Sequence, residues 1–311
     1  MVGRAPDKPV TVNEAQRQLP AGDEIFLDHI GHFVADPQAA SFALARAGFA
    51  PTPLSVQVGA DGAPTGTGNV TAMLRCGYVE VLFKTADTPL GQEFEASLAH
   101  HSGLHLAAFS TGDAARAHRR LGDAGFPMRP LVQFQRPVQT EKGLGIAAFT
   151  VVRVERGAMP EGRIQMLTHR TEDTVWQKRW LSHPNGATGL LDLVIVSADI
   201  SEAAARFERF AGKTATATPF GRVIQLDRGC ITLVTAKAFG AIFSETAIPG
   251  LPLMGAYAIQ VSSLAATTAL LDAAMLPSRR SGPALIVPFP PELGTGYWVF
   301  AEDRSDLPWR A

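Results

Sequence analysis

One pattern recurs four times along the 311 residues, and it constrains the fold more than any other feature. Each copy opens on an apolar run typical of a β-strand, and these runs span 26–34, 103–109, 190–196 and 256–261. An amphipathic helix candidate follows each run, and the four candidates begin at Pro37, Asp113, Ser201 and Leu264. Self-similarity of this kind predicts repeated units whose neighbours share a core.

The second part of each copy is repeated as well. Three helix candidates end at glycines, which tolerate the positive φ of a helix C-terminus, namely Gly48, Gly125 and Gly212. A closing strand follows a glycine in each copy, and these glycines are Gly77, Gly162, Gly229 and Gly296. Strand, helix and several antiparallel strands make a βαβββ module, which cannot bury its sheet face and its helix alone. We therefore expect the modules to pair.

The order of the modules predicts an α+β protein with two domains. Modules 1 and 2 would form a first domain at 22–170, and modules 3 and 4 a second domain at 189–303. Residues 1–21 are polar and contain three prolines, which indicates a flexible lead. Residues 171–188 carry turn residues and two tryptophans, so we expect a linker that packs against one domain.

Composition excludes several classes of function. Apolar residues make up 46% of the chain and charged residues 18%, as in ordinary globular proteins. The formal net charge of −1 provides no basic surface for nucleic acid or for an anionic membrane. No run of about 18 apolar residues suggests a membrane span, and no secretory signal is apparent, so we expect a cytoplasmic protein. Cys76 and Cys230 lie in strand-type runs, which favours buried free thiols.

This arrangement resembles the vicinal oxygen chelate superfamily, which includes glyoxalases, bleomycin resistance proteins and extradiol dioxygenases. The resemblance covers almost the whole chain after residue 22, and the run MPEGRIQMLTH resembles a bacterial branch of glyoxalase-like domain proteins. It implies that paired βαβββ modules curl into two half-open mixed-sheet barrels. It also implies that one barrel holds a divalent metal ion, to which the opening and closing strands of each module offer one inward side chain.

Four positions of the first domain match that ligand pattern. They are His29 and Glu80 in module 1, and His105 and Gln165 in module 2. Two imidazoles, a carboxylate and an amide oxygen suit a first-row divalent ion such as Zn, Ni, Co, Mn or Fe. A single histidine on an apolar strand is more often a hydrogen-bonded core residue, so the prediction depends on all four positions together. A buried Glu80 would also need a partner or a metal.

The second domain has a different set at the matching positions, namely Asp192, Thr232, Tyr257 and Val299. This set cannot hold a metal in the same way. We therefore expect the second domain to retain the sheet but to lack a metal site. A structural role, a lid over the substrate and a dimer surface are the expected uses, with a ligand pocket as the remaining alternative.

Other polar residues have less central expected roles. Asn69 and Arg75 precede the Glu80 strand, where superfamily members place groups that contact substrate, so both are candidate substrate-binding residues. His169 lies four residues beyond Gln165 on the same strand face and could reach the rim of the cavity. His32 is three residues from His29, which places it on the opposite face. GTGN has neither the spacing nor the context of a nucleotide-binding loop, and HPNGA is typical of a turn.

A metal held in this way leaves neighbouring coordination positions for two oxygens of one substrate, and the cation stabilises an enolate as a proton leaves carbon. The resemblance therefore implies a metal-dependent lyase or isomerase of the glyoxalase type, acting next to a chelated carbonyl of a small molecule. An amide cannot act as a base, so Glu80 rather than Gln165 is the candidate catalytic residue. An extradiol-type dioxygenase using His29, His105 and Glu80 is the first alternative. The second is a non-enzymatic small-molecule binding or resistance protein, and a homodimer is left open.

Overall fold

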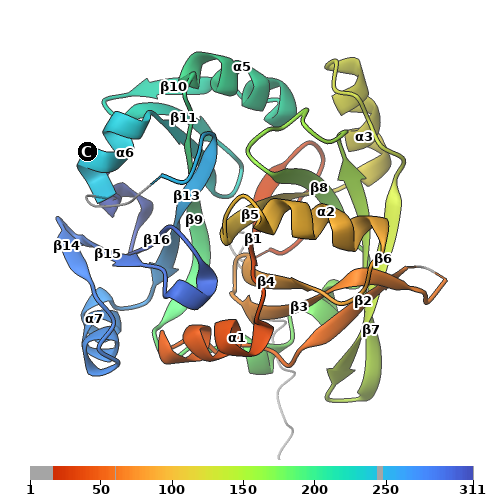
Figure 1. Cartoon of the computed structure of the whole chain (residues 1–311), viewed down its shortest axis with the longest axis horizontal. Helices are drawn as coiled ribbons and strands as arrows, with labels where there is room; N and C mark the ends of the chain where they lie inside the picture. The colour runs from red at the N-terminus through yellow and green to blue at the C-terminus, as the bar shows by residue number, and fades with distance from the viewer. Residues whose placement is uncertain (1–16, 60, 244–247, 311) are drawn as a thin grey trace, which may run out of the picture.

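The computed structural model describes residues 17–59, 61–243 and 248–310 (Figure 1). Most of the expected lead at 1–21 therefore lies outside the described residues. The first half contains β1 (Ile25–Phe33), α1 (Pro37–Arg46), β2 (Ser55–Gly59), β3 (Pro64–Met73), β4 (Tyr78–Lys84), α2 (Pro89–Leu98), β5 (Gly103–Thr111), α3 (Ala114–Asp123), β6 (Val132–Thr140), β7 (Gly143–Arg153) and β8 (Arg163–His169).

Two short helices connect the halves, α4 (Glu172–Val175) and η2 (Lys178–Trp180). The second half contains β9 (Ala187–Val196), α5 (Ile200–Ala211), β10 (Ala215–Thr218), β11 (Gly221–Gln225), β12 (Cys230–Val234), α6 (Ala236–Phe243), β13 (Leu253–Val261), α7 (Leu264–Ala273), β14 (Arg279–Ser281), β15 (Ala284–Pro288), η3 (Pro291–Leu293), β16 (Tyr297–Ala301) and η4 (Arg304–Asp306). The protein is thus α+β, and each quarter runs strand, helix, three strands.

The two halves form separate eight-stranded sheets that lie side by side (Figure 1). In the first, the order β1-β4-β3-β2-β6-β7-β8-β5 closes into a barrel. Closure comes from β2 and β6, where Val58 pairs with Gln135 and Gly59 with Phe134. In the second, the order β10-β11-β12-β9-β13-β16-β15-β14 stays open. The first half is therefore more fully closed than the half-open barrel expected from the resemblance.

The helices that follow the opening strands start and end as their sequences predict. Each has an acidic or hydroxyl N-cap whose side chain accepts from backbone N–H groups, and these caps are Asp36, Asp113, Asp199 and Ser263. The predicted glycines after three helices all have positive φ, from +65° to +86°. The fourth helix ends differently, because Met275 takes this place with a φ of 54°.

The glycine before each closing strand also has positive φ, between +83° and +142° in all four copies. These glycines also lie against the neighbouring opening strand. A Cβ on Gly77 would lie 2.6 Å from the carbonyl oxygen of Asp28, and one on Gly162 would lie 2.7 Å from that of His105. The repeated glycine is thus required both by backbone conformation and by close strand packing.

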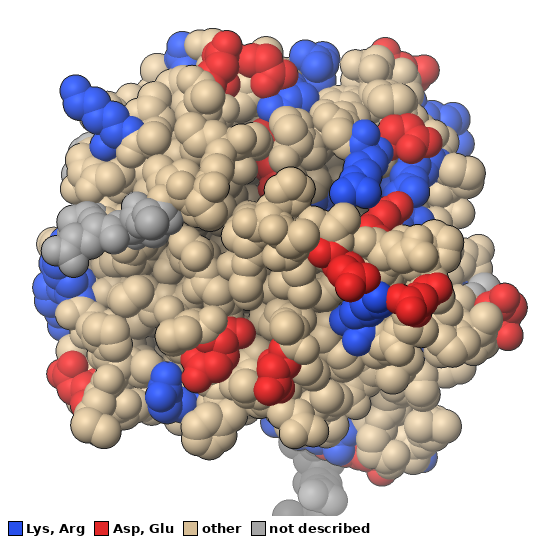
Figure 2. Space-filling model, viewed as in Figure 1, with Lys and Arg blue, Asp and Glu red and all other residues tan. Residues whose placement is uncertain are grey.

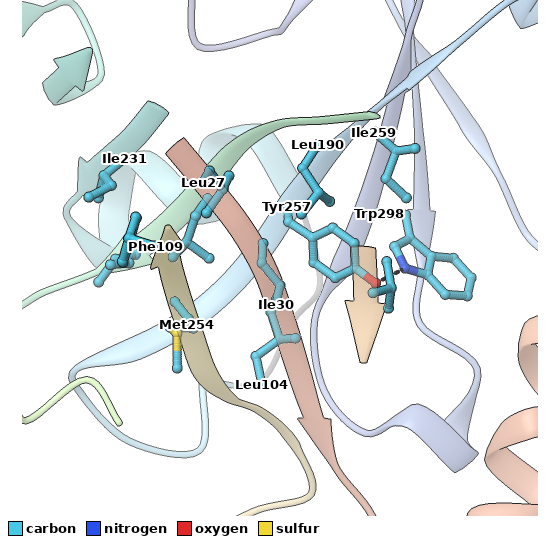
Figure 3. Packing of buried hydrophobic residues seen from close by; sticks show 14 of the residues in the cluster. Leu27, Ile30, Leu104, Phe109, Leu190, Ile231, Met254, Tyr257, Ile259 and Trp298 are labelled. Carbon is cyan, nitrogen blue, oxygen red and sulfur yellow. Dashed lines mark hydrogen bonds between the residues drawn. The ribbon is translucent and has the colours of Figure 1, made fainter. Parts of the chain in front are cut away.

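One apolar core runs between the two sheets and holds the halves together. Figure 3 shows side chains of β1 and β5, such as Ile30 and Phe109, in the same cluster as Leu190, Tyr257 and Trp298 of the second half. Smaller clusters fill the barrel interior and the inner face of the second sheet. In the connecting segment, Trp176 packs in a further cluster at one end of the barrel.

Three other observations complete the fold. Helices α2 and α6 were not anticipated from the sequence. The two cysteines form no disulfide with each other, and Cys230 is buried whereas Cys76 is partly exposed. Among the helices within the described ranges, none is both long and apolar enough to span a membrane.

Candidate active site

The interior of the barrel contains a small cavity of about 60 Å³ that three of the four predicted ligands line. His29 lies on β1, Glu80 on β4 and Gln165 on β8. Strand pairing explains why they meet, since His29 pairs with Ala108 of β5 and Ala108 pairs in turn with Gln165. Side chains of paired residues point to the same face of a sheet, and in a closed barrel this face is the interior.

A buried carboxylate fixes the orientation of His29. Asp28 Oδ1 accepts a hydrogen bond from His29 Nδ1 at 2.7 Å, and Asp28 Oδ2 accepts one from His169 Nε2 at 2.9 Å. Burial alone would raise the pKa of Asp28, but the charges and hydrogen bonds of the two histidines outweigh it and hold the pKa well below its usual range. Asp28 therefore stays ionised, and because it engages His29 Nδ1, the imidazole turns Nε2 toward the cavity.

Glu80 faces this nitrogen. Its Oε2 lies 3.5 Å from His29 Nε2, while its Oε1 accepts a hydrogen bond from Asn69 Nδ2 at 2.5 Å. The His29 ring also stacks on Tyr78, with 4.3 Å between ring centroids. Burial, with Asp28 and Glu80 nearby, raises the pKa of Tyr78 well above its usual range, so its phenol stays neutral. The cavity thus presents one imidazole nitrogen and one carboxylate oxygen side by side.

The structure corrects the placement of His105. The β5 position beside His29 and Gln165 is Ala108. His105 lies three residues earlier on β5, where a register shift between Gly31 and His32 leaves it unpaired. His105 instead lines a neighbouring cavity of about 490 Å³ and donates from Nε2 to the carbonyl oxygen of His101 at 2.7 Å. Burial lowers its pKa to about 4. The predicted four-ligand set is therefore reduced to three.

The same correction applies to the second sheet. There Asp192 pairs with Ala258, so Ala258 rather than Tyr257 occupies the inner position. Asp192 is fully buried and accepts hydrogen bonds from Thr232, from Trp309 Nε1 at 2.9 Å and from Arg310. The inner face of this sheet is thus filled by the C-terminal segment.

The predicted substrate-binding residues have different environments. Asn69 lines the barrel cavity and holds Glu80. His169 is buried and contacts Asp28, so it acts on the site through that carboxylate. Arg75 is exposed in the turn between β3 and β4 and is not among the residues that line the cavity, because the turn lies at the end of the barrel.

Asp28 was not identified from the sequence. Nor were three arginines that line the cavity, Arg136, Arg153 and Arg163. Arg136 lies on β6 between Phe134 and Val138, and this alternation of inward residues could have identified it. Arg153 and Arg163 also line the larger cavity that contains His105. Figure 2 shows Lys and Arg side chains gathered on this face between the positions of α2 and α3.

The residues present fit a divalent cation with three protein ligands. His29 Nε2, Glu80 and Gln165 would supply one nitrogen and two oxygens, and Asp28 stands behind the imidazole as carboxylates do behind metal-bound histidines. Because one donor is an amide, the site is not a cluster of His, Cys, Asp and Glu, and the described residues contain no such cluster of three or more.

Comparisons with known proteins identify the domain family and the fold. The profile of a family described as "Glyoxalase-like domain" matches residues 27–211. A search of curated protein sequences finds no significant match. A hypothetical protein from Staphylococcus aureus has a similar fold, with a TM-score of 0.63 and 10% identity over 89% of this chain and 98% of that one.

Two structures with named activities share the fold. A mutant 4-hydroxymandelate synthase from Streptomyces coelicolor has a TM-score of 0.57 and 14% identity, covering 93% of this chain and 97% of that one. A Mn(II)-bound glyoxalase from Novosphingobium aromaticivorans has a TM-score of 0.51 and 14% identity, covering 90% and 83%. At such identities the likeness concerns the fold alone.

Proposed function

Because the chain belongs to the family of glyoxalase-like domain proteins, within the vicinal oxygen chelate superfamily, we propose that it is a metal-dependent lyase or isomerase. Its reaction would be the transfer of a proton next to a carbonyl of a small molecule. The observation that carries the proposal is the pair formed by His29 Nε2 and Glu80 Oε2, 3.5 Å apart inside a closed barrel.

His29, Glu80 and Gln165 would hold the cation, which supplies Lewis-acid stabilisation of negative charge on the substrate oxygens. Asp28 orients the imidazole, since its two oxygens are engaged by His29 and His169. Asn69 holds Glu80 through Oε1, and Glu80, partly released from the cation, would take and return the substrate proton. The apolar cluster that includes Leu82, Leu106 and Val151 would shield these groups from bulk water.

A Mn(II)-bound glyoxalase shares the fold, which is consistent with a metal-dependent reaction of that type. Two observations support this choice over the alternatives. The extradiol alternative needs a second histidine beside His29, and β5 offers Ala108 there instead of His105. A non-enzymatic binding protein needs no carboxylate held ready for a proton, as Asn69 holds Glu80.

Metal analysis joined to an exchange assay tests the proposal. We expect the purified protein to bind about one Zn, Ni, Co or Mn ion and to catalyse incorporation of solvent deuterium next to the carbonyl of its substrate. Glu80→Gln should abolish the exchange. Iron with oxygen consumption on catechols would support the dioxygenase instead, and binding of small molecules that persists unchanged after metal removal, without exchange, would support the binding protein.

A further inference from the structure

Arg136 is an unusual member of the cavity wall. It is 8% exposed, and it lies on β6 facing the same cavity as His29 and Glu80. Burial lowers its pKa, which the nearby Tyr78 and Glu80 only partly oppose. Among the residues that the structure describes, none forms a hydrogen bond or an ion pair with its guanidinium. Burying such a group without a partner is costly, so an unpaired Arg136 indicates a site that a ligand completes.

The charge of the cavity supports this reading. Arg153 and Arg163 line it together with Arg136, whereas Glu80 is the one acidic residue among the described residues of its wall. Arg153 Nε is buried and has no hydrogen-bond partner within the described part of the chain. Burial lowers the pKa of Arg163 to about 10, so it remains a cation near neutral pH. A divalent cation on His29 and Glu80 would add further positive charge, and an anionic ligand would balance it.

We infer that Arg136 binds a carboxylate of the substrate, so that the substrate is a small carboxylic acid. A guanidinium presents N–H groups in a planar fork that matches the two oxygens of a carboxylate. The inference rests on the proposed function for the reaction at His29 and Glu80, but the anion site itself needs only Arg136. The volume of about 60 Å³ limits the part of the ligand inside this cavity to a few atoms. A larger group would extend into the adjoining cavity of about 490 Å³, which shares Arg153 and Arg163.

Binding to metal-free protein tests the anion site separately from catalysis. Pyruvate, malonate and phenylacetate are each titrated by calorimetry against their neutral amides, after treatment of the full-length protein with a chelator. We expect at least one carboxylate to bind more tightly than its amide. Arg136→Gln should weaken the binding of that carboxylate by about 10- to 150-fold, which corresponds to the loss of charge-assisted hydrogen bonds. Arg136→Lys should keep part of the affinity, because it retains the charge but not the fork.

Controls separate this outcome from unfolding and from a general charge effect. Arg46 lies on the exposed surface of α1, so Arg46→Gln changes the net charge equally and should leave carboxylate binding unchanged. Arg136→Gln should melt at the same temperature as the wild type or higher, because it removes an unpaired buried charge.

Equal affinity of wild type and Arg136→Gln for every carboxylate, or no preference for any carboxylate over its amide, would overturn the inference. Inorganic phosphate bound in preference to all carboxylates would overturn the assigned class. Carboxylate binding that depends on Arg136 in a protein without metal-dependent exchange would leave the anion site standing and remove the proposed reaction.

Discussion

At the scale of single residues, the most consequential feature is that two adjacent side chains of β1 serve the same site. In a regular strand, neighbours point to opposite faces. The register shift between Leu27 and His29 relaxes that rule, and Asp28 can reach both His29 and His169. A small irregularity in one strand thus supplies the carboxylate that orients the imidazole.

The metal site gives a prediction at this scale. His29→Ala should lower metal affinity by at least about 10- to 100-fold. That is the loss expected when a residue that only orients a metal ligand is removed, and His29 is itself a proposed ligand. His105→Ala should leave metal affinity unchanged, since His105 lines the other cavity. Competition with a chromophoric chelator measures both. An equal loss in the two variants would show that His105 reaches the metal and would revive the two-histidine alternative.

At the scale of elements, the sequence located most of the fold because its signals are local. Apolar runs, amphipathic segments and glycines placed the opening strands, the helices after them and the closing strands. What it could not place depends on strand pairing. The register shifts that leave His105 unpaired on β5 and place Ala258 opposite Asp192 arise between strands, as does closure by β2 and β6. Counting alternate residues from one histidine cannot reveal a bulge.

The glycines before the closing strands give a prediction for an element. Gly77→Ala should destabilise the protein by more than about 1 kcal/mol, because its φ is +84° and a Cβ would approach the Asp28 carbonyl oxygen. Gly122→Ala is the matched control within helix α3, where a Cβ meets only Met128 Cγ at 3.7 Å. It should stabilise by about 0.5–1 kcal/mol. Urea unfolding measures both changes, and a Gly77→Ala protein as stable as wild type would contradict the account.

The C-terminal segment gives a second prediction for an element. Trp309 is fully buried on the inner face of the second sheet and donates to Asp192. Trp309→Ala should destabilise by about 3–5 kcal/mol through the lost packing. Trp309→Phe keeps much of the volume but removes the donor, so it should cost about 1–3 kcal/mol. Thermal or urea unfolding should find the wild type most stable, Trp309→Phe intermediate and Trp309→Ala least stable. Equal losses of unfolding free energy in both variants would show that packing contributes little.

At the scale of the whole molecule, polar contacts join the halves through their shared core. Trp298 Nε1 donates to Tyr257 Oη at 2.6 Å, Tyr257 donates to His32 Nε2 at 3.0 Å, and His32 Nδ1 donates to the carbonyl oxygen of Leu293 at 2.9 Å (Figure 3 shows the first of these). Arg206 of α5 also forms a bidentate pair with Glu161 of the first half, at 2.7 and 2.8 Å. We therefore expect the halves to unfold together.

His32 makes this connection sensitive to pH. Burial lowers its pKa from about 6.5 to about 4, so the unfolded chain binds a proton more readily than the folded one between these values. Stability should therefore be full above about pH 6.5 and fall as the pH drops toward 4, by about 3 kcal/mol for this one histidine.

Unfolding free energies at pH 7.5 and pH 5 measure the effect. His32→Asn keeps a donor for the Leu293 carbonyl, and it should lower stability at pH 7.5 yet show a smaller loss on acidification. Burial also lowers the pKa of His105, to about 4, and the pKa of His183. Part of the decrease in unfolding free energy on acidification should therefore remain in the variant. If the variant lost as much unfolding free energy between pH 7.5 and pH 5 as the wild type does, His32 would not be a source of the pH dependence.

The pairing of β2 with β6 has a consequence for how the protein behaves at high concentration. A strand at the margin of a sheet offers unpaired amides that can recruit strands of other molecules, which is a common route to aggregation. Within the described first half, the two strands that would otherwise be margins pair with each other, through Val58 with Gln135 and Gly59 with Phe134. The second sheet does end in margins, at β10 and β14, but these have only four and three residues. Intermolecular strand addition thus has little backbone on which to begin.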